Sequence, residues 1–318
     1  MSKYRIAKFW TRLGAFLIDI LFLGVLGFFL GLFFKDYFIP LGDYGAIVGF
    51  VISIIYFTLC NSSILGGQTI GKRLTNLKVI DCDDNLLSIK GSFIRSLILT
   101  FPYFFINIGI PGLSDNSIIQ ILWAVLLLTL FIGLIYYYIF NKSTRQSLHD
   151  IVAKSYVVED YEESEQIERA LIKPIINYIY YAISILLVIS TICFSLINNN
   201  PTLEELGQLH TKLNSIDGVI KSSVNLNTTT VFGSNSSSTN LICNLVVSQK
   251  MNNNSLDSIE KNDFLKSVVS VVLNNYSGKD KIDNITINFV SGYNIGIYKS
   301  TNSIWFSKTP KEWIELTK

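Results

Sequence analysis

The sequence predicts an α-helical multi-pass membrane protein with five transmembrane helices, followed by a carboxy-terminal α+β soluble domain. Of its 318 residues, 49% are hydrophobic and only 16% are charged, whereas a soluble domain has roughly 25% charged residues. The mean hydropathy is +0.40. The apolar residues gather in blocks long enough to cross a bilayer, and the last 121 residues are rich in Asn, Ser, Thr and Lys instead.

Four apolar blocks are each long enough to span a membrane, since about 20 residues suffice for a helix. They are Leu13–Phe34, which holds the single charge Asp19, and the uncharged blocks Tyr44–Leu65, Ile118–Phe140 and Pro174–Ile197. A fifth uncharged stretch, Ser96–Ile110, is shorter and contains Pro102. By itself it fits a re-entrant or interfacial segment as well as a crossing.

The distribution of basic residues favours a crossing at Ser96–Ile110. Basic loops stay in the cytoplasm, and 14 Lys and Arg residues fall in the amino end, Gly66–Arg95 and Asn141–Lys173. The two short connections between the other blocks hold one basic residue. Five crossings therefore place the amino terminus inside and residues 198–318 outside a cell membrane, either a plasma membrane or a bacterial inner membrane.

This count divides the chain into four parts. Residues 1–158 form a four-crossing membrane domain, 159–173 an acidic cytoplasmic linker, 174–197 the fifth transmembrane helix, and 198–318 the outer α+β domain. In the loop after the second crossing, Leu74–Ile80 and Leu86–Ile89 flank a polar turn and predict a hairpin. Near residue 150, a short helical stripe precedes an extended segment, Ser155–Val158.

The outer domain reads as alternating helices and strands. Helical spacing is found at Leu203–Ile216 and Ser255–Tyr276, and Thr309 to Glu312 has capping-box spacing with Pro310 at the first helical position. Strands are predicted at Val219–Val231, Leu241–Ser248, Ile282–Val290, Ile295–Tyr298 and Ile304–Phe306. Since Cys243 is the only cysteine of this domain, a disulfide within it is excluded.

Several chemistries find no support. The segment from Gly66 to Lys72 fits G-x-x-x-x-G-K, but Arg73 follows where a phosphate loop needs Ser or Thr. The four cysteines and two histidines have no zinc or haem spacing. Neither a catalytic constellation nor a strongly basic charge balance is present. We therefore expect a protein that is not an enzyme, with no metal, cofactor or nucleic acid.

Asp19 is the informative residue, because a carboxylate inside a membrane helix costs a few kcal/mol unless it is paired, hydrated or protonated. Arg12 lies seven residues earlier on nearly the same helix face, with the two backbones about 10 Å apart. A polar relay or shared cavity joining the two is one interpretation. The other is that Arg12 reaches lipid headgroups while Asp19 pairs structurally with another helix.

The residues from about Phe9 to Val158 resemble the RDD family of membrane proteins. That family has an arginine at the start of the first helix, an aspartate within it and a later aspartate, which match Arg12, Asp19 and Asp150. GGQTIGKRLTNLKVID and RQSLHDIVAKSYVV resemble its other two motifs, although Lys154-Ser155 stands where the family has a small residue and Thr. The resemblance implies transport, with cation/proton exchange in some members. The outer domain lies beyond it.

Two functions follow from these observations. The first is a transporter of a small solute or cation, with Arg12, Asp19, Asp150 and Arg95 in a polar network and proton coupling through Asp19. The second is a non-transporting scaffold or receptor whose outer domain binds a partner protein or envelope component. The bilayer, the unknown solute or ion and a further copy of the chain are the other expected partners.

The pair His149-Asp150 has two interpretations. It is either an acid–base pair, or a helix cap or salt bridge to Lys72 or Arg73.

Overall fold

The computed structural model describes residues 2–110, 117–167, 171–197, 201–230, 237–248 and 263–317. It divides into two compact units. The first unit comprises Met1–Phe33, Asp43–Leu196 and Ile295–Tyr298, and the second comprises Phe34–Gly42, Ile197–Asn294 and Lys299–Lys318. The first unit holds the helices of the predicted membrane domain, and the second holds the predicted carboxy-terminal domain.

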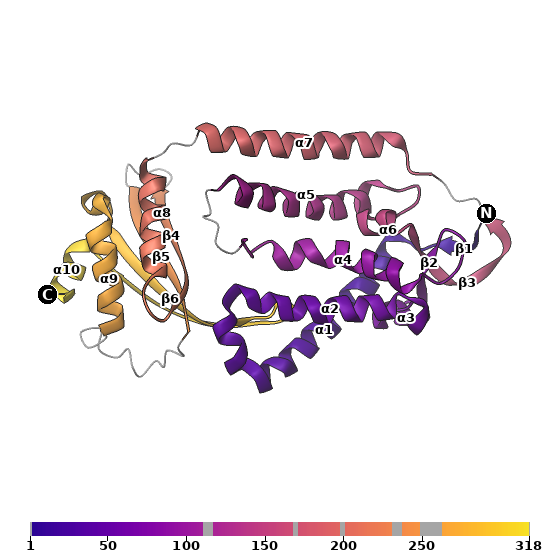
Figure 1. Cartoon of the computed structure of the whole chain (residues 1–318), viewed down its shortest axis with the longest axis horizontal. Helices are drawn as coiled ribbons and strands as arrows, with labels where there is room; N and C mark the ends of the chain where they lie inside the picture. Colours follow the sequence, from indigo (N-terminus) through magenta and orange to yellow (C-terminus); the bar gives the residue numbers. More distant parts are fainter. Residues whose placement is uncertain are drawn as a thin grey trace. The chain divides into compact units, whose positions relative to one another are not determined.

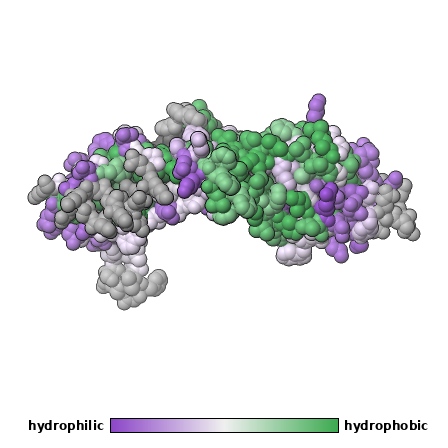
Figure 2. All heavy atoms as spheres, turned by 90° about the horizontal axis from the view of Figure 1, so that it is seen from below, coloured by the Kyte–Doolittle hydropathy of each residue, from purple (hydrophilic) through white to green (hydrophobic). Residues whose placement is uncertain are grey.

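Five longer helices build the first unit, except that the residues of the first helix after Phe33 fall in the second. They are α1 (Phe9–Phe38), α2 (Ala46–Cys60), α4 (Ile89–Phe105), α5 (Ile118–Phe140) and α7 (Pro174–Ile197). Within it, α2, α4, α5 and α7 run alongside one another in that order (Figure 1). Shorter turns connect them: η1 (Ile39–Gly45), η2 (Ser63–Leu65), α3 (Ile70–Leu74) and α6 (Leu148–Val152). Apolar side chains cover the helices on the face drawn in Figure 2.

Among the described residues, three helical stretches are long and apolar enough to cross a membrane: Phe9–Cys60, Ile118–Phe140 and Pro174–Cys193. The first contains both α1 and α2. The short third crossing predicted at Ser96–Ile110 is not among these stretches. Its helix, α4, begins at Ile89 instead and has 17 residues, including Arg95. A helical region with stretches long and apolar enough to cross a membrane is therefore confirmed, whereas the count of five crossings is not.

A small sheet of β1 (Ser2–Ile6), β3 (Ser155–Ile167) and β2 (Leu77–Asp81) accompanies these helices, in the order β1-β3-β2. The hairpin predicted for the loop after the second crossing is present in a minimal form, since an antiparallel bridge joins Ile80 to Leu86 and the Asp81 amide donates to the Asn85 carbonyl at 2.8 Å. β2 also pairs with β3, a distant strand that the sequence did not indicate as its partner. Leu77 and Val79 of β2 are buried in the core beside this sheet. Residues 159–167 of the predicted linker belong to β3.

Helix α7 packs on α5 through tyrosines. The hydroxyl of Tyr136 donates to the carbonyl of Ile176 at 3.1 Å, and that of Tyr180 donates to the carbonyl of Thr129 at 3.1 Å. A Cβ on Gly133 would lie 2.6 Å from the Tyr180 hydroxyl. Because glycine has no side chain, this position leaves room for the Tyr180 ring, and α7 packs in the same unit as α5.

The second unit is an α+β domain, as predicted. Its elements are α8 (Pro201–Asn214), β4 (Val219–Thr230), β5 (Ser237–Val247), α9 (Asp263–Asn275), η5 (Ser277–Lys281), β6 (Asn284–Asn294), β7 (Lys299–Lys308) and α10 (Pro310–Thr317). The sheet order is β4-β5-β6-β7, with β5 and β6 parallel and the other pairs antiparallel. The first eight residues of the helix predicted at Ser255–Tyr276 lie outside the described residues.

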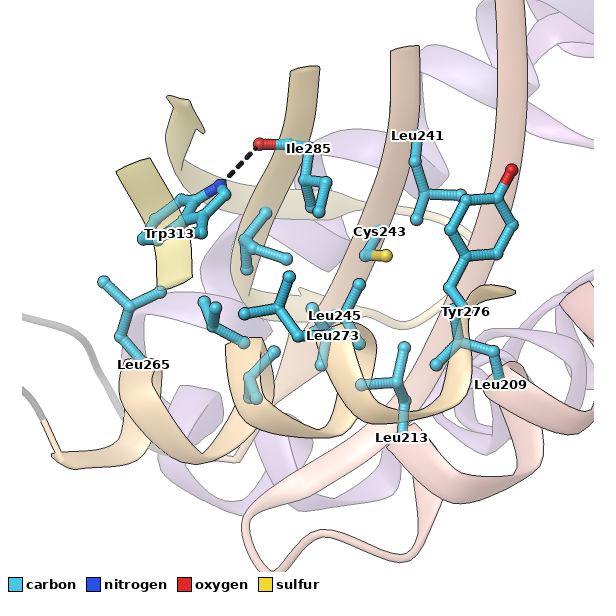
Figure 3. Packing of buried hydrophobic residues seen from close by; sticks show 14 of the residues in the cluster. Leu209, Leu213, Leu241, Cys243, Leu245, Leu265, Leu273, Tyr276, Ile285 and Trp313 are labelled. Atoms are coloured by element: carbon cyan, nitrogen blue, oxygen red, sulfur yellow. Dashed lines mark hydrogen bonds between the residues drawn. The ribbon is translucent and has the colours of Figure 1, made fainter. Parts of the chain in front are cut away.

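One face of this sheet meets the helices in a continuous apolar core (Figure 3). Trp313 of α10 is buried there, and its indole nitrogen donates to the carbonyl of Ile285 at 2.9 Å. The predicted capping box is confirmed, since the Glu312 carboxylate accepts from the Thr309 amide and the Glu312 amide donates to the Thr309 hydroxyl. The strand predicted at Ile295–Tyr298 is wrong, because Gly296 has φ +78° and the segment turns between β6 and β7.

Candidate functional site

Asp150 is the centre of a buried ion cluster, which we call the arginine–aspartate cluster (Arg12, Arg95, His149 and Asp150). Asp150 is fully buried, and its Oδ2 accepts from Arg12 Nη2 at 2.6 Å. Its Oδ1 accepts from Arg95 Nε at 3.0 Å and Nη2 at 2.8 Å. Because two guanidinium groups share one carboxylate, the cluster carries one positive charge in excess.

Local structure fixes Asp150 in this position. It occupies the third position of α6, and its carboxylate accepts from the backbone amide of Ser147 at 3.1 Å. Burial acts to raise the pKa of the Asp150 carboxyl, but the surrounding charges, including both guanidinium groups, outweigh burial and hold the pKa well below its usual range. Asp150 is therefore a carboxylate at neutral pH.

His149 completes the cluster without adding charge. Its Nε2 lies 3.1 Å from Arg95 Nη2, and burial lowers the pKa of the imidazole to about 3. The neutral ring accepts from the arginine with one nitrogen. The other nitrogen, Nδ1, is buried and has no hydrogen-bond partner among the described residues.

Asp19 lies in a separate arrangement, the Asp19 clamp (Asp19, Tyr56, Thr69 and Gly71). Its Oδ1 accepts from the Tyr56 hydroxyl at 2.7 Å and from the Gly71 amide at 2.8 Å. Its Oδ2 accepts from the Thr69 hydroxyl at 2.6 Å. With 1% of its surface exposed, this carboxylate is held by neutral donors and ties α1 to the loop that carries α3.

The glycines of that loop have separate physical roles. Gly66 and Gly67 have φ of +74° and +72°, a conformation that favours glycine. Gly71 allows close approach, since a Cβ there would lie 1.9 Å from the carbonyl oxygen of Ala15. Thr69 caps α3 by accepting from the Lys72 amide. The sequence G-G-Q-T-I-G-K thus folds as a tight turn followed by a short helix pressed against α1.

Lys72 is the third buried cation of this region. It is 9% exposed, and its Nζ makes a single long contact of 3.4 Å to the Thr69 hydroxyl. Burial, followed by repulsion from Arg95, lowers the pKa of the ammonium to about 7. In the described part of the chain no ion pair to a carboxylate is formed by this side chain.

A cavity of about 570 Å³ lies among α1, α2, α4 and α5, beside these groups. Small-molecule sites fall within about 300–1,000 Å³. Most of its wall is apolar, with lining residues such as Leu13, Leu99 and Leu134. Its charged lining residues are Arg12, Lys72 and Arg95, and no Asp or Glu of the described part of the chain lines it. The wall therefore presents positive charge to the interior, while both buried carboxylates lie behind it.

The four residues predicted as a polar network are all buried. Arg12, Arg95 and Asp150 come together, whereas Asp19 joins the clamp and shares no hydrogen bond with Arg12 among the described residues. The hydrogen bonds of Asp19 to Tyr56, Thr69 and Gly71 match the interpretation in which Asp19 pairs structurally with another helix. The helix-cap interpretation of Asp150 is also supported, but its ion pairs are to Arg12 and Arg95 and not to Lys72 or Arg73.

Sequence reasoning missed Tyr56 and Thr69, and it named Lys72 only as a salt-bridge partner of His149-Asp150. Thr69 and Lys72 belong to the quoted loop motif, which could have indicated them, whereas nothing in the apolar sequence around Tyr56 sets that tyrosine apart. The described residues contain no group of three or more His, Cys, Asp or Glu placed to hold a metal ion.

Comparison with known proteins gives one match. The RDD family model matches residues 6–154. No curated protein and no solved structure matches the chain. The matched range contains Arg12, Asp19, Arg95 and Asp150, and ends before the carboxy-terminal domain, which is a separate region that the match leaves unrecognised. Residues 6–154, which hold the helical amino-terminal region and which we call the RDD region, therefore match the RDD family model.

Proposed function

We propose that the RDD region is a transporter and that its substrate carries a negative charge. The observation that carries this proposal is the cavity wall, which presents Arg12, Lys72 and Arg95 and, among the residues that the structure describes, no carboxylate. Buried charges are retained in membrane helices chiefly where they mark substrate or ion pathways. An anion entering the cavity would offset the positive charge that Asp150 leaves uncompensated.

Cation/proton exchange through Asp19 is the competing form of the proposal. In the clamp, three donors occupy the Asp19 carboxylate, and the side chain does not line the cavity. Because its oxygens already accept three hydrogen bonds outside the cavity wall, this carboxylate is poorly placed to bind a metal cation. The clamp therefore favours a structural role for Asp19 and an anionic substrate.

Currents from proteoliposomes on a solid-supported membrane test the two forms. Concentration jumps of octanoate or inorganic phosphate should give currents with the wild type and weaker ones with Lys72→Met. Jumps of sodium should give none beyond those of empty liposomes. A sodium current that disappears in Asp19→Asn would instead support cation exchange, and the absence of any anion current would overturn the anion proposal.

The proposal includes a cell-membrane location, an inside amino terminus and a carboxy-terminal domain on the outside. Cys243 is a poor reporter of this topology, because it is fully buried and burial raises the pKa of its thiol to about 12. Cys82 is exposed, as is Ser303 on β7. In intact cells an impermeant thiol reagent should label Ser303→Cys and leave Cys82 unlabelled until lysis. The reverse pattern would contradict the topology.

A second candidate, a receptor whose outer domain binds a partner, is favoured by the open face of the second sheet. Trp305 is 68% exposed there, next to rows of amide side chains such as Asn244 and Asn288, which are joined by a 2.9 Å hydrogen bond. Cross-linking of the full-length protein in cells tests this candidate. An adduct lost in Trp305→Ala, but kept in Ser303→Ala, would support the receptor, and the same adducts in both variants would count against it.

A further inference from the structure

The cavity of the RDD region is elongated along α1. The residues of α1 that line it extend from Phe9 to Leu23 and include Leu13, Phe16 and Ile20. At 1.5 Å per residue this face is about 21 Å long. The three cations come from different elements of the wall: Arg12 is in the first turns of α1, Lys72 in α3 and Arg95 in the first half of α4. The charges of Arg95 and Arg12 both act on Lys72, so the long apolar slot has one cationic region.

One side of this slot is open. Phe16 and Ile20 on α1 line the cavity yet are 39% and 47% exposed, and Ile135 and Ile139 on α5 line it at 47% and 46% exposure. These residues belong to the apolar stretches long enough to cross a membrane. A ligand with a hydrocarbon chain would therefore reach the cavity sideways, between α1 and α5, from the lipid phase.

The wall of the cavity also holds one weakly bonded cation. The Lys72 ammonium lines the cavity and makes a single long contact of 3.4 Å to the Thr69 hydroxyl. Ser53 and His149 belong to the same wall, and each has a buried polar atom without a hydrogen-bond partner among the described residues. The Lys72 ammonium is therefore where a ligand headgroup would find both charge and a hydrogen-bond donor.

We propose that this cavity binds a single-chain amphiphile with an anionic headgroup, its chain along α1 and its headgroup at Lys72 and Arg95. This names the substrate class of the transport site proposed above and rests on that proposal. A carboxylate and a phosphate monoester share the chemistry required. The three cations of the wall favour an anionic headgroup. The length of the cavity and its opening between α1 and α5 favour a hydrocarbon chain.

Binding to the full-length protein in nanodiscs of zwitterionic lipid tests the proposal. The probes are radiolabelled palmitate and lysophosphatidic acid, with monopalmitin as the neutral and lysophosphatidylcholine as the zwitterionic comparison. Palmitate or lysophosphatidic acid should bind saturably, and whichever binds more tightly identifies the headgroup. Equal binding of lysophosphatidylcholine would mean general lipid coating and would overturn the proposal, as would binding of none of the four.

Two variants locate the ligand. Lys72→Met should weaken binding of the anionic probes about 10-fold, the loss expected for one charge-assisted contact, and should not change any weak binding of monopalmitin. Leu99→Trp, which fills the slot, should abolish binding. Ile94→Trp is the matched control, because Ile94 lies on the same helix, is 43% exposed and does not line the cavity. Equal effects of both tryptophans would overturn the assignment to this cavity.

The transport proposal and the amphiphile proposal fail differently. If octanoate or phosphate gives currents but palmitate and lysophosphatidic acid do not bind, transport stands and the amphiphile class is wrong. If the amphiphiles bind at the cavity without any current from the proteoliposomes, the site stands and transport is wrong. Circular dichroism and size-exclusion profiles of each variant separate loss of the site from loss of the fold.

Discussion

The two buried aspartates of the RDD region are held in opposite ways. Asp150 accepts from two guanidinium groups, whereas Asp19 accepts from two hydroxyls and a backbone amide. In the arginine–aspartate cluster the charge itself is needed, because it compensates other charges. In the Asp19 clamp the need is for acceptor atoms in the right places. A neutral amide of the same shape should therefore be damaging at one site and tolerated at the other.

The largest effect is expected for Asp150→Asn. It leaves the Arg12 and Arg95 guanidinium groups buried without a counter-charge, and breaking a buried pair in this way costs roughly 3–5 kcal/mol. The free energy of unfolding, measured by titrating the detergent-solubilised protein with sodium dodecyl sulfate, should fall by that amount.

Asp160→Asn is the control for this measurement. The Asp160 carboxylate pairs with Lys78 at 2.9 Å and is 37% exposed, and exposed pairs contribute about 0–1 kcal/mol. Equal losses from the two variants would show that the cluster does not depend on the Asp150 charge.

Gly71→Ala should have the next largest effect, since it changes the geometry of the clamp and keeps its charge. The new Cβ would lie 1.9 Å from the Ala15 carbonyl oxygen, so α3 must move away from α1. The hydrogen bond from the backbone amide of residue 71 to Asp19 then lengthens. Overpacking of this kind costs roughly 1–3 kcal/mol. The same titration measures the loss.

Gly14→Ala is the matched substitution on α1. A Cβ at Gly14 would have no atom within 4 Å, and replacing glycine by alanine within a helix stabilises by about 0.5–1 kcal/mol. The two glycine variants should therefore change stability in opposite directions. If Gly71→Ala is also neutral or stabilising, the close approach of α3 to α1 is not required.

Asp19→Asn sharpens the comparison most directly. The amide oxygen keeps the bonds from Tyr56 and Gly71, and the Thr69 hydroxyl turns to accept from the new amide nitrogen. What is lost is the extra strength of bonds to a charged acceptor, roughly 1–1.5 kcal/mol. The difference between this loss and that of Asp150→Asn, in the same titration, measures how unlike the two sites are. Equal losses would remove the distinction between them.

The contrast also explains what could be predicted from the sequence. Apolar blocks, amphipathic spacing and the capping box at Thr309 are local patterns, and they predicted α1, α5, α7, α8 and α10. The partners of Asp19 and Asp150 are not local. Asp19 and Thr69 lie 50 residues apart, and Arg12 and Asp150 lie 138 apart. Charge and helix-face spacing therefore suggested a relay or cavity joining Arg12 to Asp19, whereas in the structure each of the two bonds to other residues. The pairing of β2 with β3 was missed for the same reason, because the two strands are far apart in the sequence.

The smallest expected effect is a pH dependence of the free energy of unfolding that comes from Lys72. This side chain lies close enough to both sites for their charges to change the pKa of its ammonium. Burial and Arg95 lower the pKa of its ammonium to about 7, from 10.5, while Asp19 and Asp150 act to raise the pKa. Between pH 7 and pH 8 the unfolded chain keeps this proton and the folded chain releases it. The unfolded state then binds more protons, so the free energy of unfolding rises with pH, by roughly 1 kcal/mol over that interval.

Wild type and Lys72→Met, unfolded side by side from pH 6 to pH 9, isolate this contribution. The wild type should gain stability relative to the variant above pH 7 and run parallel to it below. If the two curves stay parallel throughout, Lys72 keeps an ordinary pKa and the carboxylates of the two sites compensate its burial. In Asp19→Asn the rise in the free energy of unfolding should begin at a lower pH than in the wild type. One of the two negative charges that raise the pKa of Lys72 is then gone, while Asp150 still pairs with its two arginines.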